Sequence, residues 1–275
     1  MRAQLDYRSW RFLGAAPDRD AQPASPGVAG VMAGAQWASP LQSPGRVQWR
    51  MDATPVSIAV QDAQPVSGLL TRPRAARACF VFAHGAGAGM THHFMAAFAA
   101  DLAAGDVACL RYQFPFMERG SKRPDSAATA QTAVRAAVAA AAGLAPGLPL
   151  FAGGKSFGGR MTSQAQAASP LAGVRGLGFI GFPLHPGGKP GVARAAHLCD
   201  VNLPMLFLQG DRDKLADLAL LHPVVERLGT RVRLVVFPQA DHSFHVPARS
   251  GRTDAEVRGQ VAEALVHWMV EVGGA

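Results

Sequence analysis

A short segment near the middle of the chain sets the strongest limit on its fold. Residues 150–160 read LFAGGKSFGGR, in which an apolar run leads to Ser156, and a pattern compatible with a helix continues to Ala168. A serine on such a sharp strand-to-helix turn projects its hydroxyl away from the sheet and has a strained backbone. Crowding there is relieved only where the residues two before and two after the serine lack side chains. Gly154 and Gly158 meet this requirement.

The same letters admit two other interpretations. Gly154, Lys155 and Ser156 would end a phosphate-binding loop, but that loop also needs a glycine where Pro149 stands. A flexible glycine turn with a surface serine is the second alternative. Because G-x-S-x-G is common by chance, a catalytic role for Ser156 needs support from other motifs in the chain.

Composition narrows the class of protein. The 275 residues are 49% hydrophobic, enough for a sizeable core, and no apolar run reaches the length of a membrane span. The net charge of +8 comes from scattered arginines without interleaved aromatics, which favours neither nucleic-acid nor membrane binding. Cys79, Cys109 and Cys199 are widely spaced, which predicts buried thiols in a reducing, cytoplasmic compartment. No residue spacing indicates a metal, and we expect no cofactor.

Residues 1–50 differ from the rest of the chain. They are rich in Ala, Gly, Pro, Ser and Gln and show no hydrophobic period, which predicts a disordered N-terminal extension. The apolar patch at 27–35 comes too late, after acidic residues, to indicate a secretory signal. Residues 51–275 are predicted to form one folded domain. Met51, where the folded pattern begins, is a hypothetical alternative start.

From residue 56 onward, apolar runs alternate with helical patterns, which predicts an α/β fold. The expected sheet is mostly parallel and twisted, with helices on both faces and with a hairpin of edge strands first. Between residues 183 and 197 there is room for a compact loop but not for a large lid domain. The predicted strands cover 56–60, 68–70, 78–82, 107–112, a run from 150, 177–182, 205–208 and 232–237; the predicted helices cover 92–103, 126–142, 161–168, 216–228 and 254–270.

A glycine-rich loop follows the strand at 78–82, where functional groups of such sheets gather. It begins at His84, and its glycine spacing resembles a dinucleotide-binding loop except that the third glycine comes one residue early. Placed beside the serine, it instead supplies backbone N–H groups for an oxyanion. We expect the donors to be the N–H groups of Ala86, Gly87 and Phe157, with His84 bracing the loop.

Two later strands are followed by the other groups that a reactive serine needs. A serine hydroxyl is a weak nucleophile until an imidazole takes its proton, and a carboxylate must orient that imidazole. Asp211 and Asp213 come after one strand, and His242 and His245 come after the next. The order serine, acid, histidine is the one that this type of sheet enzyme uses. Position alone leaves open which Asp and which His act with Ser156.

Taken together, these motifs give the chain a resemblance to α/β-hydrolases over about residues 51–272. Within that superfamily it resembles the branch containing the hydrolase-like subunit of the NSL histone-acetyltransferase complex, its testis-expressed relatives and bacterial predicted hydrolases. It is more distantly similar to dienelactone hydrolases. The resemblance implies Asp213 as the acid and His242 as the base. The motifs that carry it are HGAG at 84–87, FPFME at 114–118, RPD at 123–125, GKSFGGR at 154–160, PLHPGGKP at 183–190, QGDRD at 209–213 and DHSF at 241–244.

The sequence also suggests where a substrate would lie. We expect an apolar wall from Phe114 and Phe116 and a polar rim from His185, Lys189 and Arg194. This combination would suit a small acyl group bearing a carboxylate or phosphate, although solvated or paired charges explain the rim equally well.

The predicted function is therefore a serine hydrolase that cleaves an ester or a related acyl bond through an acyl-enzyme intermediate. A thioester or peptide bond is an alternative target. A catalytically silent interaction module with the same fold is the rival hypothesis from another class. The expected partner is a small acyl substrate, and the oligomeric state is open.

Overall fold

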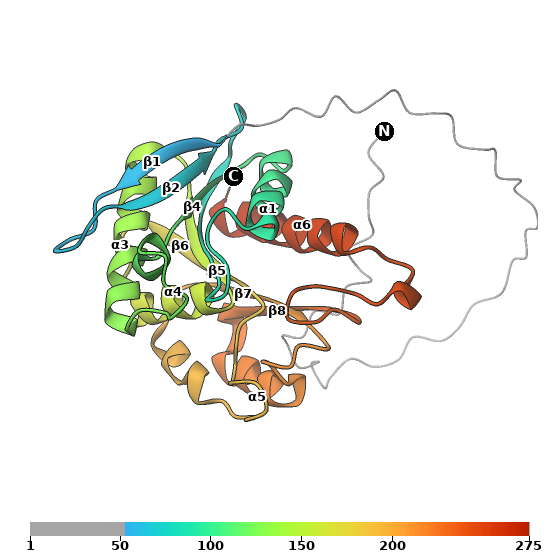
Figure 1. Cartoon of the computed structure of the whole chain (residues 1–275). Coiled ribbons are helices and arrows are strands. Elements are labelled where there is room, and N and C mark those ends of the chain that lie inside the picture. Colours follow the sequence, from blue (N-terminus) through green and yellow to red (C-terminus); the bar gives the residue numbers. More distant parts are fainter. Residues whose placement is uncertain (1–52, 275) are drawn as a thin grey trace, which may run out of the picture. The chain divides into compact units, whose positions relative to one another are not determined.

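A computed structural model describes residues 53–274, which build one eight-stranded sheet in the order β1-β2-β4-β3-β5-β6-β7-β8 (Figure 1). The β1–β2 and β2–β4 pairs are antiparallel, and every other neighbouring pair is parallel. The strands are β1 (Thr54–Ile58), β2 (Val66–Thr71), β3 (Ala78–Ala83), β4 (Val107–Tyr112), β5 (Leu150–Lys155), β6 (Val174–Ile180), β7 (Met205–Gly210) and β8 (Val232–Phe237).

Helices cover both faces of this sheet, and each face has its own hydrophobic core. α1 and α6 pack on one face, whereas α3, α4 and α5 pack on the other (Figure 1). The predicted fold class is confirmed, and no large lid interrupts the described residues. The helices are α1 (His93–Ala104), α2 (Pro115–Glu118), α3 (Ala127–Leu144), α4 (Phe157–Ala168), α5 (Leu218–Leu228) and α6 (Asp254–Gly273), with 3-10 turns η2 (Ala193–Asp200), η3 (Gly229–Arg231) and η4 (Ala248–Ser250).

Local sequence explains these boundaries. β3 and β4 are buried along their whole length, as continuous apolar runs in the middle of a two-sided sheet should be. Ser126 caps α3 by accepting from the Thr129 N–H. Thr253 and Glu256 form a reciprocal capping box at the start of α6. Each cap satisfies backbone N–H groups that the first turn of a helix leaves without a partner.

Four details of the expectation need correction. The first hairpin exists, but only β1 is an edge strand, because β2 also pairs with β4. Four short elements, α2, η2, η3 and η4, were not predicted, since segments of three to eight residues leave too little periodicity to detect. The end of the loop predicted at 183–197 therefore belongs to a 3-10 turn. Cys199 is exposed, unlike buried Cys79 and Cys109. The predicted disorder of residues 1–50 and the alternative start at Met51 lie outside the described residues.

The topology brings the candidate functional groups to one edge of the sheet. β3, β5, β6, β7 and β8 are mutually parallel neighbours, so their carboxyl ends meet at that edge. The glycine-rich loop follows β3, Ser156 follows β5, Asp213 follows β7 and His242 follows β8. Open parallel sheets bind their ligands at this edge.

Candidate active site

Ser156 occupies a strained turn between β5 and α4. Its backbone has φ 52° and ψ −116°, and a positive φ is uncommon for any residue other than glycine. The turn is held on both sides, because the Ser156 N–H donates to the Ile180 carbonyl at 3.1 Å and the Ser156 carbonyl accepts from Arg160 N–H at 3.2 Å. Such strain persists only where the surroundings over-determine it, and it concentrates at functional sites.

The two glycines that flank the turn are required by close packing against β3. A Cβ atom at Gly154 would lie 2.5 Å from the Ala83 carbonyl oxygen. A Cβ atom at Gly158 would lie 2.5 Å from the same oxygen and 2.6 Å from the His84 carbonyl oxygen. The sequence prediction that these positions must lack side chains thus has a direct geometric basis.

We expect Gly158→Ala to lower the free energy of unfolding by about 1–3 kcal/mol or more, because the clash is with backbone that cannot rotate away. The matched control is Gly143→Ala, at an exposed position of α3 where a Cβ would meet nothing within 4 Å. That change should stabilise by up to about 1 kcal/mol, since Ala is the better helix former. Urea denaturation measures both, and equal shifts in the two variants would show that Gly158 is not tightly packed.

A chain of hydrogen bonds links Ser156 to His242 and Asp213. The Ser156 Oγ lies 2.8 Å from His242 Nε2, and His242 Nδ1 lies 2.7 Å from Asp213 Oδ2. Because the carboxylate accepts, Nδ1 carries the proton and Nε2 is left to accept from the serine hydroxyl. Asp213 is buried, whereas 24% of the His242 side chain is exposed. This arrangement allows proton removal from Ser156.

Asp213 is itself held by a residue that the sequence reasoning missed. Gln209 Nε2 donates to Asp213 Oδ2, and the Leu215 N–H donates to Oδ1 at 2.8 Å. The Gln209 Oε1 accepts from the Phe182 N–H at 3.0 Å, so both ends of this fully buried amide are engaged. A polar residue at the end of an otherwise apolar strand was the available signal, since buried amides need partners.

The structure also separates the alternatives that position left open. Asp211 is exposed and lies outside the hydrogen-bond chain. His245 contacts Asp254 instead, with 2.8 Å between His245 Nδ1 and Asp254 Oδ2. The hydrogen bond from this carboxylate raises the pKa of His245. Asp213 and His242, which the family resemblance implied, are the pair brought to Ser156.

The glycine-rich loop is braced from below by His84. This side chain is fully buried, and its Nδ1 lies 2.7 Å from the Gly85 carbonyl, to which it donates. Its Nε2 accepts from the Phe114 N–H at 3.0 Å. Burial lowers the pKa of His84 to about 4, so the ring is neutral at pH 7 and keeps this donor–acceptor pattern. His84 therefore fixes the loop, as expected.

The predicted oxyanion donors border the serine. Ala86 and Gly87 line the same pocket as Ser156, and a Cβ at Gly85 would lie 3.8 Å from the Ser156 Cβ. Phe157 is the first residue of α4, where a backbone N–H has no partner within the helix. The helix N-terminus also favours negative charge.

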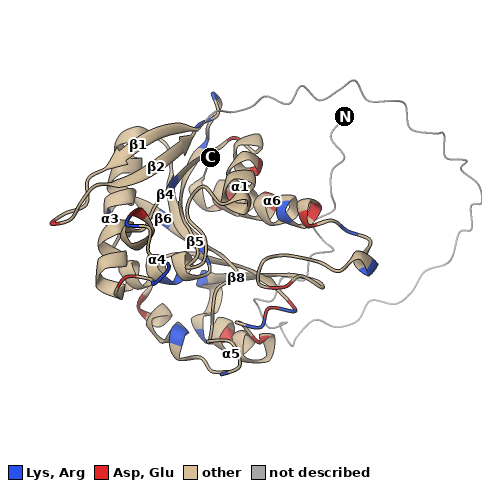
Figure 2. Ribbon diagram, viewed as in Figure 1, with Lys and Arg blue, Asp and Glu red and all other residues tan. Residues whose placement is uncertain are grey.

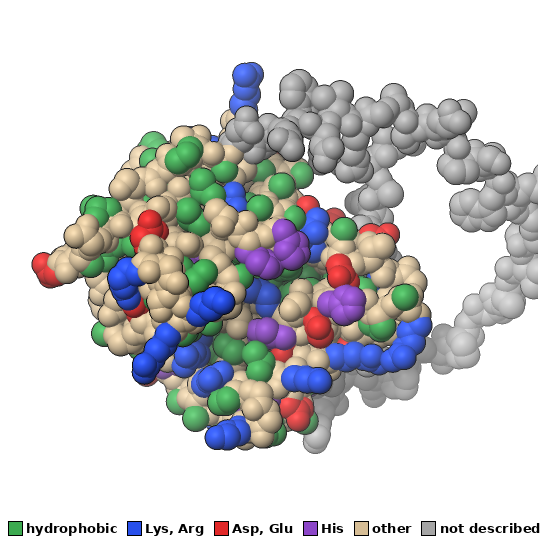
Figure 3. All heavy atoms as spheres, in the orientation of Figure 1, with side chains coloured by type: hydrophobic (Ala, Val, Ile, Leu, Met, Phe, Trp, Pro, Cys, Tyr) green, Lys and Arg blue, Asp and Glu red, His purple; other side chains and the backbone are tan. Residues whose placement is uncertain are grey.

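A pocket of about 650 Å³ opens over Ser156 and His242. Figure 3 shows histidine side chains gathered around a hollow on this face, among Lys and Arg side chains. The size suits a small organic ligand. Its lining residues are Gly85, Ala86, Gly87, Ala88, His92, His93, Phe94, Met95, Lys155, Ser156, Leu215, His242, Ser243, Phe244, His245, Asp254 and Arg258.

The predicted apolar wall lies elsewhere, which corrects part of the expectation. Phe114 and Phe116 are fully buried, and their rings pack against Phe157 at centroid distances of 5.3 and 6.2 Å. They form the core beneath the serine turn instead of a pocket surface. The aromatic residue that lines the pocket from α1 is Phe94, and Phe244 follows β8.

The predicted polar rim is also corrected. His185 is buried, with Nδ1 2.9 Å from the Pro186 carbonyl and Nε2 accepting from the Asp217 N–H at 3.2 Å. Both ring nitrogens of His185 are therefore engaged, one within its own loop and one at the start of α5, and neither is free for a ligand. Lys189 and Arg194 do not line the pocket; Lys189 lies in the exposed loop before η2, and Arg194 lies in η2 itself.

A second serine–histidine contact lies in the described residues but lacks the other parts of a reactive site. Ser163 Oγ is 2.7 Å from His197 Nε2 and 3.0 Å from the Arg160 carbonyl. Burial, and then the charge of Arg160, lowers the pKa of His197 to about 4. No carboxylate bonds to His197 in residues 53–274, and neither member of the pair lines the Ser156 pocket. The pair ties η2 to α4.

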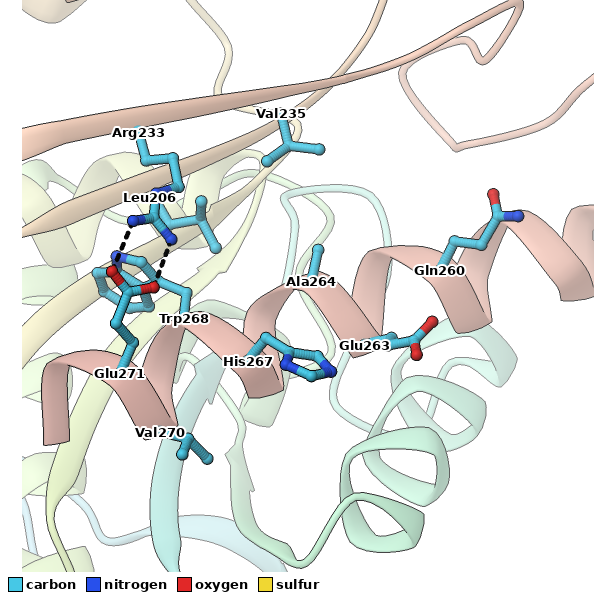
Figure 4. A pocket seen from close by; sticks show the side chains of 10 residues that line it. All are labelled: Leu206, Arg233, Val235, Gln260, Glu263, Ala264, His267, Trp268, Val270 and Glu271. Atoms are coloured by element: carbon cyan, nitrogen blue, oxygen red, sulfur yellow. Dashed lines mark hydrogen bonds and ion pairs between the residues drawn. The ribbon is translucent and has the colours of Figure 1, made fainter. Parts of the chain in front are cut away.

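Another pocket, of about 360 Å³, lies between α6 and the strands β7 and β8 (Figure 4). Arg233 and Glu271 form a bidentate ion pair across it, with both N–O distances 2.7 Å. Trp268, Leu206 and Val235 supply its apolar walls. None of its lining residues is a serine, threonine or cysteine, so it offers no hydroxyl or thiol nucleophile, and the Ser156 pocket is the candidate active site.

Residues 53–274 lack both a metal-binding cluster and a membrane-spanning helix. No group of three or more His, Cys, Asp or Glu side chains is placed to hold a metal ion. No helix in this part of the chain has both the length and the apolar character needed to cross a bilayer.

Comparison with known proteins identifies the family. Residues 76–270 match the model of the alpha/beta hydrolase domain family, so the chain belongs to that family. The structure is similar to dienelactone hydrolase from Anabaena variabilis, with 22% identity, a TM-score of 0.66, and coverage of 80% of this chain and 97% of that one. These matches do not test the narrower resemblance to the NSL-complex branch, which stays a prediction.

Two further solved structures share the fold. An alpha-beta serine hydrolase homologue from Coxiella burnetii is 19% identical with a TM-score of 0.63, covering 79% of this chain and 100% of that one. A serine hydrolase without a lid from Xanthomonas campestris is 21% identical with a TM-score of 0.62, covering 80% and 96%. At these identities the likeness establishes the architecture, and the reaction has to be argued from the site.

Proposed function

We propose that this protein is a serine hydrolase that cleaves an ester or a related acyl bond. The observation that carries the proposal is the continuous hydrogen-bond chain from Ser156 through His242 to Asp213, at the floor of an open pocket. Family membership and the serine hydrolases among the structural neighbours support the same reaction class.

In the proposed reaction, Ser156 Oγ attacks the carbonyl carbon while His242 Nε2 accepts the hydroxyl proton. Asp213 stabilises the resulting imidazolium and fixes its orientation. Negative charge develops on the carbonyl oxygen, where the N–H groups of Phe157 and of Ala86 or Gly87 are available as donors. Collapse expels the leaving group, which takes the proton from His242 and leaves an acyl-serine. Water, deprotonated by the same imidazole, then releases the acid and restores the serine.

The rival function is a catalytically silent interaction module. The strained Ser156 backbone favours catalysis over that alternative, because a merely structural turn has no need for a serine at positive φ. On the basis of its sequence motifs, we also propose that the chain is related to the branch that contains the hydrolase-like subunit of the NSL complex.

A panel of chromogenic esters with acyl chains of two to eight carbons, run beside acyl thioesters, tests the proposal. We expect turnover of at least the short esters, because a pocket of about 650 Å³ has room for a small acyl group. Faster turnover of the thioesters would indicate that the target is a thioester instead of an ester. Absence of turnover for every substrate by folded protein would favour the interaction module.

We also propose that the protein acts in a reducing compartment such as the cytoplasm. All three cysteines are free thiols, and Cys79 and Cys109 lie buried on the neighbouring strands β3 and β4. Burial raises the pKa of Cys79 to about 12 and also raises that of Cys109, so both stay protonated and unreactive at neutral pH.

A further inference from the structure

The charges in the sheet are unevenly distributed. Every charged residue within the eight strands is a cation, and Figure 2 shows the strands otherwise almost free of charge. Arg111, Arg175 and Arg233 lie along β4, β6 and β8, whereas Lys155 ends β5 at the carboxyl edge. It directly precedes Ser156 and lines the same pocket. The mechanism proposed above gives this lysine no task.

The Lys155 ammonium group has a built environment. Its Nζ donates to the His242 carbonyl oxygen and lies over the rings of Phe244 and Phe94, at 5.5 and 6.0 Å from their centroids. Gly181, with φ 67°, leaves the space that the ammonium occupies, since a Cβ there would lie 3.0 Å from Nζ. Cations are stabilised over aromatic faces, so these contacts hold the charge in place.

The other charged groups at this site are already neutralised or engaged. Arg258 pairs with Asp101 at 2.7 Å, and the Asp254 carboxylate pairs with His245 at 2.8 Å, so neither cation is left over for a ligand. The rings of His92 and His93 lie 4.4 Å apart, and burial lowers the pKa of His92.

Two acidic groups face Lys155 from the strand ends but do not form an ion pair with it. Asp213 and Asp241 both act to raise the pKa of Lys155, against the larger effect of burial, which lowers it to about 8. The Asp213 oxygens bind His242, Gln209 and Leu215, and Asp241 Oδ1 accepts from the N–H groups of Ser243 and His245. Among the described residues that line the pocket, Lys155 is the cation without an ion-paired carboxylate.

We propose that Lys155 makes the pocket selective for esters whose acyl chain carries a carboxylate. The proposal rests on the proposed hydrolase function. An ammonium group has three N–H donors, and the His242 carbonyl uses one of them. A carboxylate entering beside Ser156 would accept from another in a site where aromatic rings exclude water and strengthen the attraction. Because Lys155 and Ser156 line the same pocket of about 650 Å³, the carboxylate and the scissile ester have to fit in it together, as they do in a short diacid monoester.

The test compares two substrates of similar size, p-nitrophenyl hemisuccinate and p-nitrophenyl valerate. The readout is the ratio of their kcat/KM values, anionic over neutral. In Lys155→Met we expect this ratio to fall about tenfold to a hundredfold, the range for one lost charged hydrogen bond. The matched control is Lys189→Met, an exposed lysine outside the pocket, which should leave the ratio unchanged.

A pH series on the unaltered protein supplies a second readout that does not depend on a variant folding. Lysine is charged below its pKa, so the ratio should fall as the pH rises from 7 to 9 through the Lys155 pKa of about 8. Lys155→Met should show no such pH dependence of the ratio.

The outcomes separate this proposal from the one on which it rests. If Lys155→Met slows both esters equally and the ratio is flat with pH, the lysine only holds the His242 segment and the carboxylate role is overturned. If the unaltered protein turns over neither ester, the hydrolase function itself fails. An equal drop of the ratio in Lys189→Met would move the anion site to the loop at 183–190.

Discussion

Replacing Ser156 with alanine is expected to lower kcat for a short chromogenic ester by about a million-fold, with little change in stability. The estimate is the loss measured when the serine of a comparable triad is removed. Without Oγ no acyl-serine forms, and His242 Nε2 loses the hydroxyl from which it accepts. Steady-state kinetics at pH 7 measure the loss, and thermal denaturation checks that the variant is folded.

The chain provides a matched control for that experiment in Ser163. This buried serine also contacts a histidine, His197, at 2.7 Å, but it lies within α4 and outside the pocket. Ser163→Ala should therefore retain turnover and lose about 1 kcal/mol of stability, the typical contribution of one hydrogen bond. If Ser163→Ala abolished turnover and Ser156→Ala did not, the nucleophile would have been assigned to the wrong serine.

Replacing Asp213 with asparagine is expected to reduce kcat by about 10⁴-fold while the protein stays folded. An amide NH₂ facing His242 Nδ1 would favour the tautomer with its proton on Nε2, which cannot accept the proton of Ser156. The measurement is kcat for the same ester across pH 6–9.

Asp211→Asn is the control for the acid, since it makes the same chemical change two residues away on an exposed side chain. We expect its kcat to stay within a few-fold of the unaltered protein, because exposed charges contribute little. A reversed result, with Asp211→Asn inactive and Asp213→Asn active, would contradict the role given to Asp213.

Much of the fold was predictable because its signals are local. Strands β3 and β4 are continuous apolar runs that only a sheet covered on both faces can bury, and β8 was predicted with its observed limits, Val232–Phe237. The serine turn was predictable because the positions two before and two after the serine must lack side chains, and Gly154 and Gly158 occupy them within a segment of five residues. Short elements such as α2 carry no comparable signal, since one turn shows no period.

The site was less predictable, because it depends on which way side chains point. Phe114 and Phe116 follow a strand end whether they line a pocket or pack beneath the serine, and sequence does not distinguish the two. The sequence patterns include Lys155 in a phosphate-loop pattern and in the GKSFGGR motif but give it no role of its own, yet the structure places it in the pocket, beside the residues that follow β6 and β8. The role of Gln209 in holding Asp213 depends on a hydrogen bond between the two side chains, which only the folded end of β7 makes visible.

The most direct test of the central claim is the site of covalent labelling by a fluorophosphonate probe. The probe reacts with serines that a neighbouring base activates, so it reports on the chemistry without knowledge of the substrate. Intact-mass and peptide mass spectrometry should find one adduct, on Ser156, in the unaltered protein and none in Ser156→Ala. An unlabelled native protein, or a Ser156→Ala variant labelled as strongly as the native one, would contradict the assignment of Ser156 as an activated nucleophile.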